Sequence, residues 1–337
     1  MNKLTKIGIS ALCGSLAAVS AANAGEMTVT GSANATYTKL GYGTTGNPLG
    51  MTSALSFAGS GELDNGNTFS VGIDHDDKNA WSAANITMQI GGMGTLQLDQ
   101  GGGTGIDRLD DKMPTAKEEA FDTGVATGIS TVTGVGGQTD IEWTVSPDML
   151  PDGLSAYVAY SPRADGTKNN DKASGGSNLE HRGSGYDIVL EHSGLYDGLN
   201  VFAGYSSIEQ TDAGFDGDFK SRVLGATYAM GSVTVGYQYS KETPNVDAGI
   251  KWYENNAYSI AFNVNDDLSI SYGKHESERG SNNDHSDATL EAESMQLSYT
   301  MGGATIAIAD SSVDHGLYVS TTANDRDGTT VWLTLAF

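Results

Sequence analysis

The feature that most limits the possible folds of this chain is a period of two in its apolar residues. The period recurs in short segments from one end of the chain to the other. In the closing stretch VWLTLAF, for example, Val331, Leu333, Leu335 and Phe337 share one face. Successive side chains of a strand point to opposite sides, so each segment predicts a strand with one apolar face. Long helical periodicity is missing, and the sequence therefore predicts an all-β fold.

The connections between these segments alternate strictly between short and long. The short ones are turns rich in Gly, Asn and Asp, at 63–66, 91–93, 147–153, 194–198, 230–231, 265–267 and 301–303. The long polar ones are about 39–50, 75–80, 99–138, 162–184, 208–219, 241–255, 275–290 and 311–328. Seven short and eight long connections join sixteen strands. Hairpin turns at one rim and long loops at the other are typical of an antiparallel 16-stranded transmembrane β-barrel. A soluble sandwich has no reason to sort its loops in this way.

The last strand has a partner only if the barrel closes. An open sheet edge in lipid would leave backbone groups without hydrogen bonds, so the last strand must pair with the first, at about 26–38. We assign barrel closure and assembly to Val331, Leu333, Leu335 and Phe337.

The N-terminal segment has the layout of a secretory signal peptide. Lys3 and Lys6 precede an apolar stretch, and small residues end at Ala24. We therefore expect residues 1–24 to be a cleaved signal peptide and residues 25–337 to be the barrel. Cys13, the single cysteine, would be lost with the signal. Export without disulfides favours a bacterial envelope over a small disulfide-stapled secreted fold.

The chain is strongly acidic, with 42 Asp and Glu against 18 Lys and Arg and a formal net charge of −24. This charge opposes binding to nucleic acid and favours cations. Beyond the signal there is no run of about 18 apolar residues, so a membrane-spanning helix is not expected. A barrel crosses a membrane without such a run, because only every second residue of its strands meets lipid.

Several segments resemble the general porins of Gram-negative bacteria, of the alphaproteobacterial type. They are the alanine-closed signal, GEMTVTGSANATYT at 25–38, GELDNGNT at 61–68, the long loop after LQLDQ at 96–100, and VWLTLAF at the end. The resemblance covers the whole mature chain. It implies a homotrimer of sixteen-stranded barrels in the outer membrane, each with its own water-filled pore narrowed by an inward-folded third extracellular loop. It also implies that the outer-membrane assembly machinery recognises the terminal residue, Phe337.

The third loop, about 99–138, is the longest, as the resemblance requires. We expect it to form the pore constriction through its charged residues, which are Asp107, Arg108, Asp110, Asp111, Lys112, Lys117, Glu118, Glu119 and Asp122. Pro114 can open a short helix there as its first residue. The loop lacks the proline-glutamate-phenylalanine-glycine stretch that relatives carry.

The parity of the strands predicts which charges line the wall of the pore. The inward positions are Asp74, Asp99, Asp140, Glu142, Asp187 and Glu191. Basic residues such as Lys241 and Lys274 fall at strand ends or in loops, and we place no arginine cluster opposite the acidic loop. A cation-preferring pore is therefore expected. The alternative is that these acids are solvated charges without control over permeation, since salt screens exposed charges beyond roughly 8–10 Å.

The sequence contains no motif for catalysis, so we do not expect an enzyme. A nucleophile elbow, a phosphate-binding loop and a zinc-protease helix are all absent. No cofactor and no resident metal are expected, although calcium bound at acidic loop clusters such as 74–77 and 324–327 stays open. The histidines, His275 among them, are read as exposed loop residues.

Three functions remain for such a barrel. The first is a porin for passive diffusion of small hydrophilic solutes and cations. The second is an outer-membrane channel specific for one substrate, and the third is a structural or adhesive barrel with a plugged lumen. Expected partners are further copies of the chain, outer-membrane lipids, the assembly machinery and the permeating solutes. A soluble secreted β-protein is the reading that would exclude all three.

Overall fold

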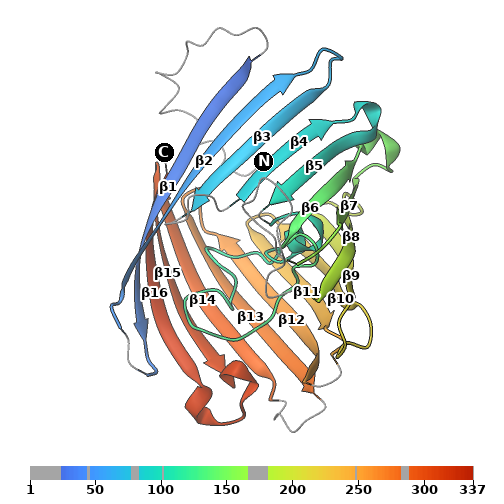
Figure 1. Ribbon diagram of the computed structural model, residues 1–337. Coiled ribbons are helices and arrows are strands. Elements are labelled where there is room, and N and C mark those ends of the chain that lie inside the picture. The colour runs from blue at the N-terminus through green and yellow to red at the C-terminus, as the bar shows by residue number, and fades with distance from the viewer. Residues whose placement is uncertain are drawn as a thin grey trace.

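The computed structural model is an all-β closed barrel (Figure 1). It describes residues 24–43, 46–76, 83–100, 102–165, 181–246, 249–281 and 288–336. Among these residues, regular helix is confined to five short 3₁₀ turns: η1 Gly91–Met93, η2 Gly105–Leu109, η3 Pro147–Met149, η4 Gly316–Tyr318 and η5 Thr322–Asn324. No described helix is long and apolar enough to cross a membrane.

Sixteen antiparallel strands form the barrel, which confirms the predicted fold class. In chain order they are β1 Ala24–Leu40, β2 Leu49–Glu62, β3 Thr68–Asp76, β4 Ala83–Gln89, β5 Gly94–Gln100, β6 Thr139–Val145, β7 Leu154–Ser161, β8 Arg182–Ser193, β9 Leu199–Gln210, β10 Phe219–Met230, β11 Val233–Thr243, β12 Ile250–Asn263, β13 Leu268–Ser281, β14 Leu290–Met301, β15 Ala304–Asp314 and β16 Arg326–Ala336.

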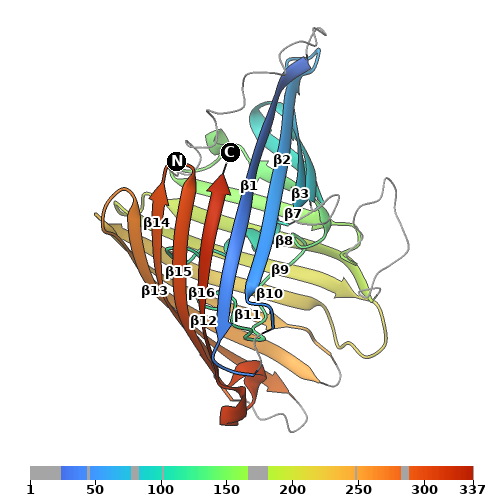
Figure 2. The same cartoon turned by 90° about the vertical axis from the view of Figure 1, so that its left-hand side faces the viewer.

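Each strand pairs with its neighbours in the sequence, and β16 closes the barrel by pairing with β1 (Figure 2). Val331 lies opposite Tyr37, and Leu333 lies opposite Ala35. Leu333 and Leu335 expose 40% and 48% of their surface, as residues facing lipid would. Phe337 lies outside the described residues. Closure leaves no strand edge unpaired, which is the condition for a sheet to span a bilayer.

The two faces of the wall differ in the way that the period of two predicts. Along β14, Met295 and Leu297 are exposed on the outer face, whereas Ser294, Gln296 and Ser298 on the inner face are buried. The outer face is thus apolar and the inner face is polar. This is the inverse of a soluble protein, and it suits a sheet with hydrocarbon outside and water within.

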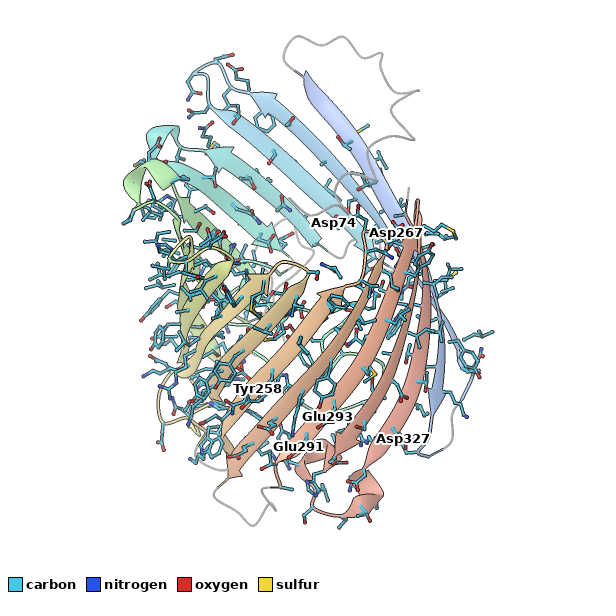
Figure 3. All side chains as sticks on the ribbon, turned by 180° about the vertical axis from the view of Figure 1, so that it is seen from behind. Asp74, Tyr258, Asp267, Glu291, Glu293 and Asp327 are labelled. Carbon is cyan, nitrogen blue, oxygen red and sulfur yellow. The ribbon has the colours of Figure 1, made fainter. Side chains whose placement is uncertain are left out.

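Two of the predicted loops are too long, because the strands continue into them. Strand β13 runs to Ser281 through the predicted loop 275–290, and β12 begins at Ile250 within the predicted loop 241–255. Some of the charged residues that suggested loops, such as Glu276 of β13, lie on the outer face of the strands. There Lys274 Nζ lies 2.7 Å from Glu291 and 2.9 Å from Glu276. Glu291 and Glu293 follow each other on that face of β14 (Figure 3).

The predicted helix at Pro114 is wrong. Residues 114–119 are not helical, and the short 3₁₀ turn of this region is η2, nearer to β5. The amide of Ala116 donates to Ser271 Oγ, and the amides of Lys117 and Glu118 donate to Gln296 Oε1. Because barrel side chains take these donors, the segment has no need of the hydrogen bonds of a helix.

Candidate functional site

The segment between β5 and β6, residues 102–138, lies inside the barrel and is called the inner loop below (Figure 1). Its η2 turn packs against the inner faces of β8 and β9. Ile106 and Leu109 are fully buried and form one apolar cluster with residues that include Val189 and Phe202. Gly204 leaves room for them, since a Cβ there would lie 2.8 Å from both side chains. The main apolar core of the molecule therefore lies between the loop and the wall.

Four of the predicted wall carboxylates hold the root of the inner loop. Asp99 accepts from Gly102 N at 3.0 Å, and Asp140 accepts from Thr104 Oγ1 at 2.8 Å. Glu142 accepts a hydrogen bond from Gly105 N at 2.7 Å. Asp187 accepts hydrogen bonds from both Ile106 N and Val135 N. All four acids point toward the inner loop, and all are at most 3% exposed. They anchor the loop, and the water of the lumen does not reach them.

The inner loop is also tied to the far side of the barrel. Besides the contacts at Ser271 and Gln296, Ser130 donates to Glu242 of β11 at 2.7 Å, and Asn255 of β12 donates to Ser130 O at 2.9 Å. Leu317 N, in the connection between β15 and β16, donates to Thr127 O at 2.9 Å. The loop is therefore held by contacts to strands around the barrel, from β5 to the connection that precedes β16.

The three basic residues of the inner loop all have acidic partners. The guanidinium of Arg108 binds Glu142 and lies 3.7 Å from the centre of the Tyr157 ring. Lys117 binds its neighbour Glu118, and Lys112 Nζ lies 2.9 Å from Glu191 of β8. Glu191, a predicted wall residue, thus pairs with a predicted loop residue. No cation of the loop is left to face the lumen alone.

The carboxylates of the inner loop differ in how far they are exposed. Asp111 and Asp122 are exposed. Partial burial and then the nearby charge of Glu118 raise the pKa of each. Burial raises the pKa of Asp110 to about 7, against a hydrogen bond from Thr131, and that of Glu119 to about 8, against one from Met113 N. Asp107 accepts from Gly103 N at 2.6 Å and shapes the loop.

The wall formed by β1–β5 carries no basic residue on its inner face. Lys39 is the only Lys or Arg in these five strands, and it points outward, because its neighbour Thr38 points inward to Thr330. The inner face carries hydroxyl and amide groups instead, with pairs such as Asn34 and Thr334 in contact. Asp74 faces inward here and binds Ser56. These five strands therefore hold no arginine cluster on their inner face.

Two buried side chains were missed or misread from the sequence. His275 is not an exposed loop residue. It lies on the inner face of β13, is 5% exposed, and meets the ring of Phe121 edge-on at 5.0 Å. Tyr318 of η4 is 1% exposed, and its hydroxyl lies 2.7 Å from Ser277 Oγ. Both side chains are buried because loops fold back against them inside the barrel. The sequence has no periodic pattern that predicts how these loops fold.

Within the described part of the chain, no group of three or more His, Cys, Asp or Glu side chains is arranged to hold a metal ion. Calcium at the acidic loops thus gains no support from the geometry, and Asp77 of the first cluster lies outside the described residues.

Comparisons with known proteins agree with this architecture. The family model for Gram-negative porins matches residues 8–335. The structure resembles a Salmonella typhi OmpF in complex with daunomycin, with a TM-score of 0.67 and 16% identity over 93% of this chain and 98% of that one. It also resembles a porin refined at 1.8 Å, with a TM-score of 0.66 and 14% identity over 93% and 100% of the two chains. It resembles a variant of Rh. blastica porin as well, with a TM-score of 0.57 and 18% identity over 93% of this chain and 100% of that one. No curated protein matches the chain by sequence. At these identities the structural likeness concerns the fold alone.

Proposed function

Because the chain belongs to the Gram-negative porin family, we propose that its lumen is a cation-preferring path for passive diffusion of small hydrophilic solutes across the outer membrane. The barrel supplies a hydrated route through lipid, and the charges along the route set which ions pass. The chain acts without a cofactor and without covalent chemistry.

One observation carries the cation preference, namely the charge asymmetry of the narrowed lumen. The inner loop presents Asp111 and Asp122 to water, while its own cations are bound to carboxylates. The wall of β1–β5 offers hydroxyls, amides and Asp74, and no basic group. An anion therefore meets repulsion from the loop without a compensating cation on that wall. A cation meets attraction, which is strengthened by the low-dielectric wall.

The remaining features of the proposal concern export and assembly. Residues 1–24 direct export and are removed, and the barrel is inserted by the outer-membrane assembly machinery and surrounded by lipid. The chain forms a homotrimer through its N-terminal strands. Gly31, Ala33, Ala35 and Gly59 lie on the outer face there and allow a close approach of another barrel.

The test is the reversal potential across a KCl gradient in planar bilayers. Neutralising Asp107 would also disturb the loop, because Asp107 accepts a hydrogen bond from Gly103 N. The double variant Asp111→Asn and Asp122→Asn removes the two carboxylates that face water and leaves the anchors of the loop in place. We expect its cation preference to fall.

Glu254→Gln is the matched control, because Glu254 pairs with Lys241 on the outer face of the barrel at 2.8 Å. It changes the net charge without touching the lumen, so its reversal potential should equal that of the wild type. An unchanged reversal potential in the double variant would remove the inner loop from the selectivity of the channel. Absence of any conductance in the wild type would favour a plugged structural barrel.

A further inference from the structure

A polar cavity of about 310 Å³ opens inside the barrel beside the inner loop, at the ends of β7–β10 that carry the short turns. Its lining includes Lys112 from the loop, Ser155 and Glu191 from the wall, and Asn200 and Thr227 from the next two strands. The cavity is far larger than the roughly 15 Å³ that one ordered water needs. It is bounded by the ion pair of Lys112 and Glu191, which joins the loop to β8.

The strand register explains why these side chains meet. Ser155 lies opposite Glu191, and Asn200 lies opposite Thr227. Ser193, two residues beyond Glu191, lies opposite Asn200, so Glu191 and Asn200 are diagonal neighbours. All of these positions share the inner face. Four adjacent strands thus bring one carboxylate, three hydroxyls and one amide into a single patch, and Lys112 reaches this patch from the loop.

The polar groups of the patch are only partly used. Lys112 Nζ and Glu191 Oε2 are 2.9 Å apart, and each side chain keeps more than a quarter of its surface exposed, 28% and 27%. Within the described residues, the side chains of Ser155, Asn200 and Thr227 make no hydrogen bond. Two opposite charges with access to water are therefore flanked by three groups whose hydrogen-bonding capacity is free.

We propose that this cavity is a binding subsite for small zwitterionic solutes of the amino-acid class. The solute's carboxylate binds Lys112, its ammonium group binds Glu191, and Ser155, Asn200 and Thr227 hydrogen-bond the remainder. The subsite deepens the proposed channel function, on which it rests, by selecting one class among the permeating solutes.

The ion pair itself explains this choice of solute. Inserting any solute between Lys112 and Glu191 breaks their contact. A solute with one charge restores only one partner and leaves the other charge unpaired, and an uncharged solute restores neither. A zwitterion restores both and adds no net charge to the site. The pair is partly solvated, so binding is weak enough for the solute to leave again, as transport requires.

The test compares two solutes of equal size in proteoliposomes that contain the full-length channel. L-alanine is zwitterionic, and lactamide has the same number of non-hydrogen atoms and no charge. We expect the ratio of alanine influx to lactamide influx at low concentration to fall about threefold to fivefold in Glu191→Gln and in Lys112→Met, the range for a partly exposed charged contact.

The exchanged pair, Lys112→Glu with Glu191→Lys, separates binding from anchoring of the loop. It keeps both charges, so the ratio of alanine influx to lactamide influx should return toward the wild-type value. Glu254→Gln again serves as the control, because it breaks an ion pair of similar length, 2.8 Å, on the outer face. Its ratio should equal that of the wild type. An alanine ratio that is the same in the wild type, Glu191→Gln and Lys112→Met overturns the subsite.

A measurement on the wild type alone covers the case in which a variant fails to assemble. Alanine should reduce the single-channel current in a saturable way, and lactamide should reduce it only in proportion to its concentration. Equal behaviour of the two solutes overturns the subsite while leaving the channel function intact. Absence of single-channel current overturns the channel function itself.

Discussion

The cation preference of the channel should rise with pH, because two carboxyl groups of the inner loop titrate near neutrality. Asp110, with a pKa of about 7, lies near Asp107, Asp111 and Glu242, and Glu119, with a pKa of about 8, lies near Asp110, Asp111 and Asp122. Burial holds both in the neutral form at pH 6. At pH 9 both are ionised almost completely, so the loop gains nearly two negative charges over this interval.

The size of the effect follows from Coulomb's law. One charge about 8 Å from a permeating ion in water contributes about 0.5 kcal/mol, and screening at about 0.1 M salt leaves roughly half of it. The change lowers the energy of a cation and raises that of an anion by the same amount. Two charges then change the ratio of cation to anion permeability by about fivefold, which corresponds to about 1 kcal/mol.

The assay is the reversal potential across a KCl gradient, measured between pH 6 and pH 9. The wild type should show the rise, and the double variant Asp110→Asn and Glu119→Gln should lose most of it. The variant preserves side-chain size and the acceptor for Met113 N. The relevant quantity is the difference between the two proteins, because any other effect of pH on the channel is common to both. Equal pH profiles would refute the assignment of these pKa values to the loop.

Three further predictions concern stability and assembly. Because the pKa values of Asp110 and Glu119 are raised, the folded chain binds more protons than the unfolded chain between about pH 4 and pH 8. The free energy of unfolding should therefore fall as the pH rises through this range. A thermal unfolding temperature that does not change with pH would contradict the burial of these two groups. Leu109→Ala should remove about 2–5 kcal/mol of packing energy between the loop and the wall. The looser loop should increase the noise of the single-channel current. Noise equal to that of the wild type would mean that the polar anchors alone hold the loop. Leu333→Arg should destabilise the closing strand by up to about 2–4 kcal/mol. The temperature at which the barrel unfolds, measured by the change in gel mobility of heated samples, should fall, and it should fall less in the control Leu333→Ala. Equal unfolding temperatures of the two variants would place Leu333 away from lipid.

The course of the inner loop could not be predicted from the sequence beyond its position and its length. Its inward fold was expected from the family resemblance, but the roles of its charges were not. Parity predicts the inner face for Asp99, Asp140, Glu142 and Asp187, but their burial depends on amides and a hydroxyl from a loop that has no period. The pairing of Lys112 with Glu191 joins residues 79 apart in the chain. No local pattern encodes such a contact.

The sequence by itself determined the barrel. In a strand the side-chain direction is a local property with a period of two, and hairpin turns have their own residues, so strand number, the two faces and closure of β16 on β1 could all be derived from neighbours along the chain. Tertiary structure alone decided which charges meet water. Burial and pairing of a charge depend on the groups that surround it in space, and for the inner loop those groups come from strands as far apart as β5 and β16. The same carboxylates are therefore anchors, ion-pair partners or part of the permeation path according to contacts that the sequence does not place side by side.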